Sequence, residues 1–457
     1  MNPQTHVEEL ISKARSAQQI FEGFSQEAVD RAVHAIGKAV ADNAEPLAIM
    51  AVEETKMGNV PDKIAKNRNK PKVTWYKIKG QKSRGIIRYD DEKCLVEVAK
   101  PIGVIGTSTP VTNPVMTPIH NAMIALKGGN AIIVCPHPSG FESGKETVRI
   151  MRDALKTVDA PEDLIQVVSE ASIEVSALIM ASCDTCIATG GPGMVKAAYS
   201  SGEPAFGVGA GNVQSLWDES ADIDAAVTKT ITGRTYDNGV LCTCEQSIHV
   251  PISREAEVQA AFAAQGAYVV TDDTEADKFR QALFPNGMMN KGSVGIKPFE
   301  IAKMAGIRIP EETKQIVIRI SKLGADEVLA KEKLFPVLSM YVYEGWESAV
   351  RNAGINIDNE GTGHSCVIHS TIKRNIEYAA ERIHCARFVV NQIASGSLGG
   401  TLANGLNPTG TLGCGSWGNN SITENLWWHH LVNISRIAYE IPDAPALKLS
   451  DEELWSI

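Results

Sequence analysis

Residues 100–114 read KPIGVIGTSTPVTNP and residues 130–138 read NAIIVCPHP, and these two stretches decide the fold. Each contains a short apolar run bounded by Gly, Pro or Asn, which is typical of a buried strand. The pattern continues downstream, with helical periodicity between the runs. The predicted strands are Ile102 to Gly106, Ala131 to Cys135, Leu164 to Val168 and Thr185 to Ala188, and the helical stretches include Glu142 to Lys156 and Ile173 to Ala181.

Strands that alternate with helices predict βαβ units and an α/β fold with a parallel sheet covered on both faces. Ligands of such sheets bind at the carboxyl ends of the strands, so the loops after each strand are where chemistry is expected. A second αβ region follows the turn signal at residues 236–239. Its predicted strands are Ser247 to Val250, Gln315 to Ile320 and Val337 to Tyr343. The loop-dense end from about Val389 is more typical of a site than of a linker.

Upstream of the first quoted stretch, the chain predicts paired helices and a basic segment. Ser25 is a plausible helix cap, and the apolar residues that recur at helical spacing are Val29, Val33, Ile36 and Val40. The segment from Asp62 to Arg88 is rich in Lys and Arg. We interpret it as a solvated face or exposed arm, with a patch for phosphorylated ligands as the alternative.

Composition excludes several classes of protein. The 457 residues carry 44 Lys and Arg against 54 Asp and Glu, a net charge of -10, without the concentrated basic face of a nucleic-acid binder. We find no apolar stretch long enough to span a membrane and no signal-peptide core at the N-terminus. The nine cysteines are an odd number scattered over a long chain. We therefore expect a cytoplasmic protein with reduced thiols and neither nucleic-acid nor membrane partners.

Three glycine clusters compete for a cofactor role. TGGPGMVKAA, from Thr189, follows a predicted strand and opens a helix, where backbone amides attract an anion. Gly413, Gly415 and Gly418 have the spacing G-x-G-x-x-G, but they follow a loop, so we interpret that match as spurious. The cluster GVGAGN from Gly207 has the wrong spacing for this fingerprint. A bound dinucleotide would therefore be held in an unorthodox way.

Any of the nine cysteines could be a catalytic nucleophile, a metal ligand or a buried core residue. Cys183 and Cys186 form a C-x-x-C without a second pair to complete a zinc site, so no metal site is predicted. The thiols that we interpret as core are Cys94, Cys135, Cys366 and Cys385. Cys242 lies after a turn and before a strand, where a nucleophilic thiol belongs, with Cys244 as its rival.

Taken together, these stretches resemble the CoA-acylating branch of the aldehyde dehydrogenase superfamily. The resemblance covers nearly the whole chain. Besides the two opening stretches it rests on IATGGPGMVKAAYSSG, FGVGAGN, TGRTYDNGVLCTCEQS, KEKLFPVL, GTGHSCVIHS and TLGCGSWGNNSITEN. It implies two doubly wound parallel-sheet domains and an oligomerisation arm. The expected divisions are residues 1–232 for the cofactor domain with an arm near 79–98, 233–425 for the catalytic domain, and 426–457 for a C-terminal return and tail.

The resemblance assigns roles to individual residues. The family's nucleophile falls on Cys242, and its oxyanion-stabilising Asn falls on Asn113. An amide and a backbone N–H aimed at the developing alkoxide contribute about 3–4 kcal/mol to stabilising the transition state. His364, in a Gly-His motif, would handle the CoA thiol proton, or else it is a core histidine. The implied cofactor residues are Pro136, His137, Pro138, Ala188, Thr189, Gly190, Gly191, Pro192, Gly193 and Glu332, with Glu332 at the nicotinamide-side ribose.

One departure from the hydrolytic relatives indicates the acylating branch. Those enzymes carry a Glu that activates water, and the matching position here is Gly207. Without a general base, water attack loses about 10²–10⁴-fold, so the CoA thiol can accept the acyl group instead. The glycine is also expected to leave room for that thiol. From the sequence, Gly207→Glu is expected to raise CoA-independent aldehyde oxidation.

The expected reaction is reversible and ping-pong: aldehyde, CoA and NAD or NADP give acyl-CoA and the reduced cofactor. Trp427, Trp428, His429 and His430 would narrow the pocket, and a His or Arg234 would meet an anionic end. This favours sulfoacetaldehyde slightly, with succinate semialdehyde or acetaldehyde as alternatives. A thiol acyltransferase without nicotinamide is the alternative class. The resemblance further implies a homo-oligomer, a dimer or tetramer, with contacts from the arm and from the tail after Arg436.

Overall fold

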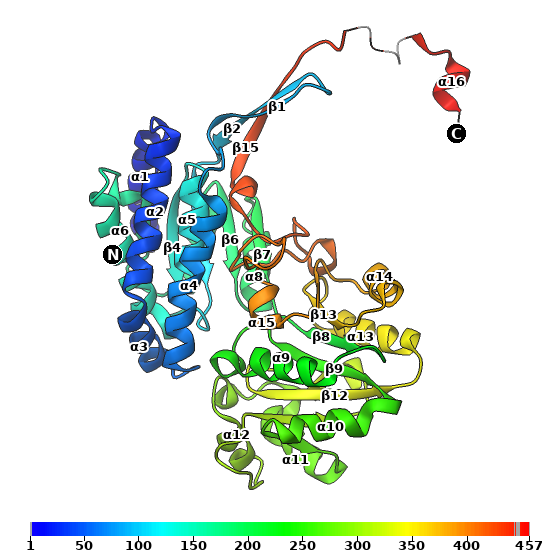
Figure 1. The fold of residues 1–457 in the computed structure, drawn as a ribbon. Helices are drawn as coiled ribbons and strands as arrows, with labels where there is room; N and C mark the ends of the chain where they lie inside the picture. Colours follow the sequence, from blue (N-terminus) through cyan, green and yellow to red (C-terminus); the bar gives the residue numbers. More distant parts are fainter. Residues whose placement is uncertain (1, 443, 445–447, 457) are drawn as a thin grey trace.

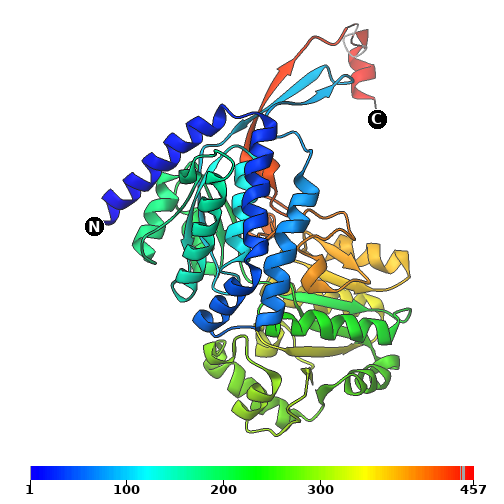
Figure 2. The same ribbon diagram turned by 60° about the vertical axis from the view of Figure 1, so that its left-hand side comes forward.

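The structure is a computed structural model that describes residues 2–442, 444 and 448–456, apart from the side chain of Pro192. Figures 1 and 2 show two α/β halves and a thin arm that projects from the first half. Each half is built around its own parallel sheet. No helix of the described residues is long and apolar enough to cross a membrane.

The first sheet has five parallel strands in the order β5-β4-β3-β6-β7. They are β3 (Val104–Thr109), β4 (Ala131–Pro136), β5 (Ile165–Val167), β6 (Thr185–Thr189) and β7 (Ala205–Val208). Its strands β3 and β4 are buried along their whole length, which is why they are apolar throughout rather than alternating.

Helices cover both faces of this sheet. On one face lie α5 (Met116–Lys127) and α6 (Phe141–Lys156), and on the other α1 (Pro3–Glu22) and α7 (Ile173–Ser182). An outer layer packs against α5 and α6: α2 (Gln26–Asp42), α3 (Ala44–Thr55) and α4 (Val60–Ile78). The Ser25 side chain accepts a hydrogen bond from Ala28 N and caps α2, as predicted. Helix α8 (Pro192–Tyr199) joins β6 to β7.

The second sheet has seven parallel strands in the order β10-β11-β12-β9-β8-β13-β14. They are β8 (Val213–Trp217), β9 (Glu245–Pro251), β10 (Ala267–Val270), β11 (Gln315–Arg319), β12 (Val337–Tyr343), β13 (Cys366–His369) and β14 (Phe388–Val390). Its helices are α9 (Ile223–Thr235), α10 (Glu255–Ala264), α11 (Asp273–Leu283), α12 (Pro298–Met304), α13 (Trp346–Asn359), α14 (Lys373–Arg382) and α15 (Ala394–Ser397).

The chain passes from the first sheet to the second between Val208 and Val213. The sequence placed the division at 232–233, about one helix downstream. The difference arises because β8 pairs with β9 and β13 of the second sheet, so it brings α9 into that half. The other predicted divisions, a catalytic domain that ends at residue 425 and a C-terminal return and tail over 426–457, remain predictions.

The arm is a three-stranded antiparallel sheet in the order β1-β2-β15. Its strands are β1 (Gly85–Asp90), β2 (Leu95–Pro101) and β15 (Val432–Ala438), and α16 (Asp451–Trp455) lies beyond it. Cys94 lies in the turn between β1 and β2 with φ 49°, half-buried, so the prediction that it is a core thiol is wrong. The other predicted core thiols, Cys135, Cys366 and Cys385, are buried.

Candidate active site

Cys242 lies on the connection between the 3₁₀ turn Tyr236–Gly239 and β9, at the junction of the two halves. The side chain of Cys242 is half-buried, whereas Cys244 is fully buried. The neighbouring Thr243 Oγ1 donates to the carbonyl of Ser395 in α15, at 3.2 Å. A Cβ on Gly211 would lie 2.2 Å from the Cys242 carbonyl oxygen, so only glycine permits this close approach of the two loops. Of the two rival thiols, only Cys242 is open to a ligand.

The surroundings of Cys242 disfavour a free thiolate. Burial raises the pKa of the Cys242 thiol, and the nearby Glu332 raises it further, while Arg387 lowers it. Burial likewise raises the pKa of Glu332 to about 8, although Gly211 N donates to Glu332 Oε1 at 2.8 Å. A carboxyl group of this pKa can take up or release a proton near neutral pH. The thiol therefore needs a proton acceptor, and Glu332 is one candidate.

His364 lies beside the same loop. It is fully buried, and its Cε1 would be 3.0 Å from a Cβ on Gly211, the residue that also meets the Cys242 carbonyl. Within the described residues, neither ring nitrogen has a hydrogen-bond partner. Burial, and then the charge of Arg387, lower the pKa of His364 to about 3. The imidazole is thus neutral at physiological pH, and its burial beside Arg387 disfavours the protonated form.

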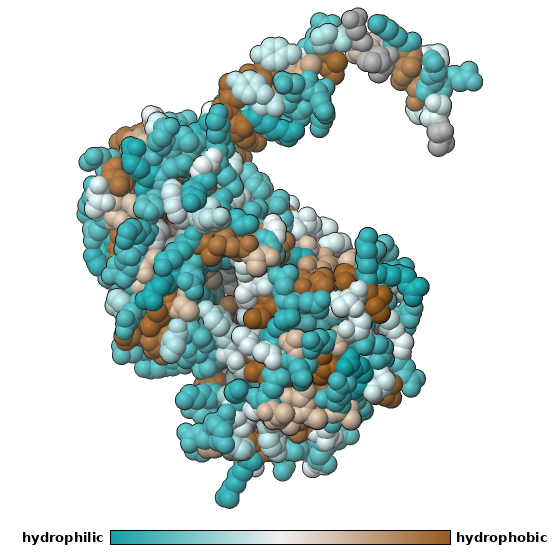
Figure 3. All heavy atoms as spheres, viewed as in Figure 1, coloured by the Kyte–Doolittle hydropathy of each residue, from teal (hydrophilic) through white to brown (hydrophobic). Residues whose placement is uncertain are grey.

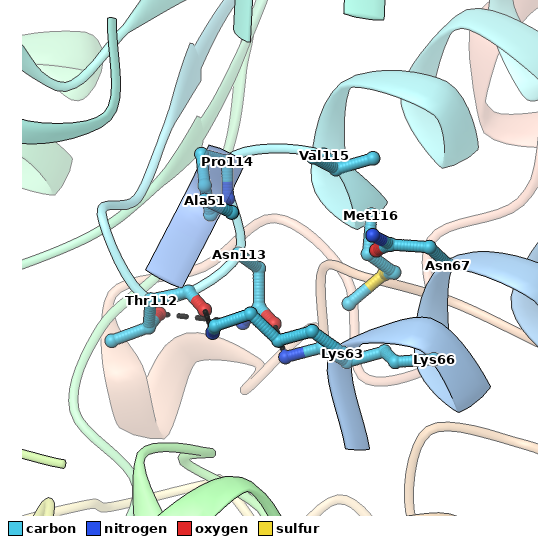
Figure 4. Close-up of a pocket in the computed structure, with 9 residues that line it drawn as sticks. All are labelled: Ala51, Lys63, Lys66, Asn67, Thr112, Asn113, Pro114, Val115 and Met116. Carbon is cyan, nitrogen blue, oxygen red and sulfur yellow. Dashed lines mark hydrogen bonds between the residues drawn. The ribbon is translucent and has the colours of Figure 1, made fainter. Parts of the chain in front are cut away.

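Asn113 follows β3, and a lysine holds its side-chain amide. Lys66 Nζ, from α4, donates to Asn113 Oδ1 at 2.5 Å. An ammonium group can only donate, so this contact fixes which end of the amide is the oxygen. Asn113 Nδ2 is therefore turned away from Lys66, where it bonds Thr112 Oγ1 at 3.3 Å. Figure 4 shows Lys63 and Lys66 reaching from α4 to the Thr112–Asn113 segment.

Asp237 joins this lysine pair to the Cys242 loop. Its Oδ2 accepts from Lys63 Nζ at 2.9 Å and from Lys66 Nζ at 2.7 Å, and all three side chains are buried. Burial lowers the pKa of Lys63 to about 8 and opposes the charged form of Asp237, but the two lysines together hold the Asp237 pKa below its ordinary value. Asp62 lies in the same cluster, where its Oδ2 accepts from Asp237 N at 2.7 Å, so the two lysines are matched by two carboxylates and Lys66 is the cation that contacts Asn113.

These contacts correct the interpretation of residues 62–88 as a solvated basic face or exposed arm. Helix α4 turns Lys63, Lys66 and Asn67 inward, and only the later part of the segment reaches the arm. The sequence did contain a signal, because these residues recur at three- and four-residue spacing and so share one helix face. The missing partner, Asp237, is 171 positions from Lys66 in sequence.

Two helix starts of the first half are candidate anion sites, and one is already occupied. Glu54 accepts from Glu142 N and Ser143 N, both at 2.9 Å, and so fills the start of α6. The start of α8 has no side-chain cap, and a Cβ on Gly191 or Gly193 would meet no atom within 4 Å. This uncapped start, after Thr189, fits a pyrophosphate group. The Pro136–Pro138 loop lies at the end of β4, where His137 Nδ1 accepts from Ser139 N at 3.1 Å.

Around Gly207 the structure differs from expectation. A Cβ there would lie 2.8 Å from Val195 Cγ1 and 3.0 Å from Tyr199 Cε2, both on α8. The expectation that the glycine leaves room for the CoA thiol is therefore wrong, because α8 side chains fill the space. Gly413, Gly415 and Gly418 lie in a loop with a single 3₁₀ turn, so their spacing is not a dinucleotide fingerprint, as predicted.

Gly207→Glu is consequently expected to lower the melting temperature without raising CoA-independent aldehyde oxidation, since the new side chain must displace Val195 or Tyr199. Thermal unfolding and an aldehyde oxidation assay without CoA check this. Adding Tyr199→Ala makes room for the carboxylate, and the double variant is the fair test of whether a general base alone restores hydrolysis. Hydrolysis by the single variant would contradict the crowding.

Two predicted anion contacts are wrong. Arg234 is fully buried and donates to the backbone carbonyls of Val337, Lys333 and Phe335, so it cannot reach a substrate. His429 and His430 both contact Glu424 Oε1.

The tryptophans that were expected to narrow the pocket are packed instead of lining an open pocket. Trp427 is buried against the His120 ring, and Trp428 Nε1 donates to Gln81.

The structure thus has two parallel sheets, a half-buried thiol at Cys242 and an uncapped helix start on the first half, an arrangement that suits an α/β enzyme with a cofactor and a cysteine nucleophile. The aldehyde dehydrogenase family model matches residues 2–291. The chain is 48% identical over 455 residues to a succinate-semialdehyde dehydrogenase (acetylating) of Clostridium kluyveri, which covers 100% of both chains. It is 38% identical to a sulfoacetaldehyde dehydrogenase of an Acholeplasma species, over 97% of this chain and 92% of the relative.

Solved structures agree. An acetylating aldehyde dehydrogenase from Geobacillus thermoglucosidasius matches with a TM-score of 0.93 and 38% identity, over 97% of this chain and 98% of the other. A propionaldehyde dehydrogenase of Rhodopseudomonas palustris, solved with bound CoA and an acylated cysteine, matches at 0.85 and 26%, over 95% and 97%. The chain belongs to the aldehyde dehydrogenase family. It is an acylating, CoA-dependent aldehyde dehydrogenase, so the alternative of an acyltransferase without nicotinamide is set aside.

Proposed function

We propose that the enzyme oxidises succinate semialdehyde reversibly to succinyl-CoA, with transfer of a hydride to the nicotinamide cofactor, through a thioester on Cys242. The choice of substrate rests on the 48% identity, over the full length of both chains, to a succinate-semialdehyde dehydrogenase (acetylating). The sulfoacetaldehyde dehydrogenases reach 38% and 36%. This reverses the slight preference for sulfoacetaldehyde, whose supposed anion contacts at Arg234, His429 and His430 are engaged elsewhere.

The first step joins Cys242 to the aldehyde. The sulfur attacks the carbonyl carbon, the thiol proton passes to Glu332, and the carbonyl oxygen becomes an alkoxide. Asn113 Nδ2, whose orientation Lys66 fixes, donates to that alkoxide. The Lys66 ammonium at Asn113 Oδ1 polarises the same amide and strengthens it as a donor.

A nicotinamide cofactor, NAD or NADP, supplies the hydride acceptor when bound. The residues that fit it are Thr189 to Gly193 at the uncapped start of α8 for the pyrophosphate, with the Pro136 to Pro138 loop at the end of the neighbouring strand β4. Glu332, held at Oε1 by Gly211 N, is assigned by the resemblance to the nicotinamide-side ribose.

The second half-reaction moves the acyl group to CoA. The CoA thiol attacks the thioester carbon, and Cys242 leaves as the thiolate. We assign the CoA proton to His364, because the ring lies beside the Cys242 loop and, within the described residues, both of its nitrogens lack a partner. With Gly207 in place of a carboxylate, no side chain at that position activates water, so CoA is the acceptor.

The experiment is an assay of cofactor reduction with succinate semialdehyde, sulfoacetaldehyde and acetaldehyde, each with NAD and with NADP, in the presence and absence of CoA. We expect CoA-dependent reduction, with kcat/KM highest for succinate semialdehyde. A higher kcat/KM for sulfoacetaldehyde would overturn the substrate. Equal rates without CoA would overturn the role given to Gly207.

The arm supports a homo-oligomer, a dimer or tetramer. Its strands expose apolar side chains on a thin projection from the body of the molecule, as Figure 3 shows. These are Ile86, Tyr89 and Ile437, with Tyr439 just after the end of β15. Exposed apolar side chains on a small antiparallel sheet of this kind are typical of a surface that a second subunit covers.

A further inference from the structure

Helix α4 carries a third inward lysine, Lys70, whose surroundings differ from those of Lys63 and Lys66. Its side chain is half-buried, and Nζ donates to the backbone carbonyl of Gly399 at 2.9 Å. Burial alone lowers the pKa of Lys70 to about 7, since no acidic side chain of the described residues is close enough to raise it. Lys63 and Lys66 share Asp237, but Lys70 has no compensating anion.

The walls around Lys70 come from both halves of the molecule. The Gly399 carbonyl also accepts from Thr409 N, and a Cβ on the next residue, Gly410, would meet Met116 Sδ at 3.6 Å and His120 Cδ2 at 3.8 Å. The loop after α15 therefore packs Lys70 against the first turns of α5. The charge of Lys70 reaches His120: burial, and then Lys70, hold the pKa of that imidazole well below its ordinary value.

Two further donors near this point have no partner. Asn67 Nδ2 and Thr117 Oγ1 are buried and, within the described residues, make no hydrogen bond. Asn67 lines a small pocket together with Asn113 and Met116, as Figure 4 shows, and Thr117 follows Met116 at the start of α5. Buried donors without acceptors are rare in native structures, and a ligand with acceptor oxygens would satisfy them.

The position of Lys70 relative to Asn113 matches a short substrate. Lys66 contacts Asn113, and Lys70 lies four residues further along the same face of α4, a rise of about 6 Å. In succinate semialdehyde two methylene groups separate the carbonyl from the carboxylate, a comparable span. An aldehyde oxygen at Asn113 would thus place its distal carboxylate toward Lys70.

We propose that Lys70, with Asn67 as a second donor, binds the distal carboxylate of the aldehyde substrate and selects short aldehydes that carry an anion two methylenes from the carbonyl. This assignment rests on the proposed function, because it takes the carbonyl to be bound at Asn113. Binding supplies the anion that Lys70 lacks. A neutral aldehyde of the same length leaves the ammonium uncompensated, and the enzyme discriminates against it.

The test compares succinate semialdehyde with butanal, a neutral aldehyde with the same number of carbons, at saturating CoA and cofactor. In Lys70→Met we expect the ratio of the two kcat/KM values to fall at least about 30-fold, mainly through the KM for succinate semialdehyde. Lys70→Arg keeps the charge and should recover part of the ratio. Lys72→Met, an exposed lysine on the same helix, should leave the ratio as in the wild type.

Other results separate the two proposals. A wild-type enzyme without CoA-dependent oxidation of succinate semialdehyde overturns the proposed function. If the wild type is active and the ratio of the two kcat/KM values is unchanged in Lys70→Met, only the proposed binding of the carboxylate by Lys70 is overturned. Equal losses for both aldehydes in Lys70→Met also overturn it, because they indicate a structural role. Should Lys70→Met fail to fold in a thermal unfolding assay, Lys70→Gln, which retains a donor, is measured in its place. A lower ratio of the two kcat/KM values is expected for this variant. An unchanged ratio would overturn the role of Lys70 in binding the carboxylate.

Discussion

Cys242→Ala should reduce CoA-dependent aldehyde oxidation by at least about 10⁴-fold, because removal of a covalent nucleophile abolishes both half-reactions. Cys244→Ala should retain most of the activity. Its thiol is fully buried among Val240, Leu241 and other apolar side chains, and burial raises its pKa to about 12. Steady-state assays of the two purified variants, with thermal unfolding to verify that each is folded, measure the difference.

This pair is well matched, since both substitutions remove one sulfur from the same short loop. The opposite pattern, activity without Cys242 and none without Cys244, would contradict the nucleophile assignment. Small losses in both variants would show that neither thiol carries the acyl group.

Asn113→Ala should lower kcat by about 10²–10³-fold, the usual effect of removing one oxyanion donor. Lys66→Met should also lower kcat, by about 10-fold or more, because the amide of Asn113 is then free to rotate and loses its polarising charge. The two effects should not add. In the double variant, Lys66→Met should cost little beyond Asn113→Ala, since Lys66 acts through Asn113.

Lys63→Met is the matched control for Lys66→Met. Both lysines bond Asp237 Oδ2, but Lys63 reaches the Thr112 carbonyl at 3.4 Å and not the Asn113 amide. We expect comparable shifts in melting temperature and a clearly smaller loss of kcat for Lys63→Met. Equal losses of kcat, or additive losses in the Lys66 and Asn113 double variant, would mean that Lys66 is only structural.

Much of the fold could be predicted from apolar runs. The predicted strand Val337 to Tyr343 matches β12, and Gln315 to Ile320 differs from β11 by one residue. Ile102 to Gly106 was displaced from β3 (Val104–Thr109), because the polar residues Thr107, Ser108 and Thr109 extend the buried strand. Short strands such as β7, β10 and β14 gave no distinct pattern, since three or four residues are too few for periodicity.

In the candidate site, too, residues with short-range sequence signals could be predicted, whereas residues whose partners are distant in sequence could not. Local context indicated the start of α8 and narrowed the nucleophile to Cys242 or Cys244, because glycines after a strand and a turn before a strand are short-range signals; the family resemblance then favoured Cys242. The lysines of α4 could not be assigned, since their burial depends on Asp237 and Gly399, which are distant in sequence. Arg234 failed for the same reason: its carbonyl partners lie about a hundred positions away.

The most direct test of the account is the covalent state of Cys242 during turnover. The enzyme is mixed with succinate semialdehyde and oxidised cofactor without CoA, quenched rapidly, digested and analysed by tandem mass spectrometry that separates Cys242 from Cys244. We predict a succinyl thioester on Cys242 that disappears when CoA is added, with equivalent formation of succinyl-CoA. An acyl group on another cysteine, or turnover with no acyl group on Cys242, would contradict the account.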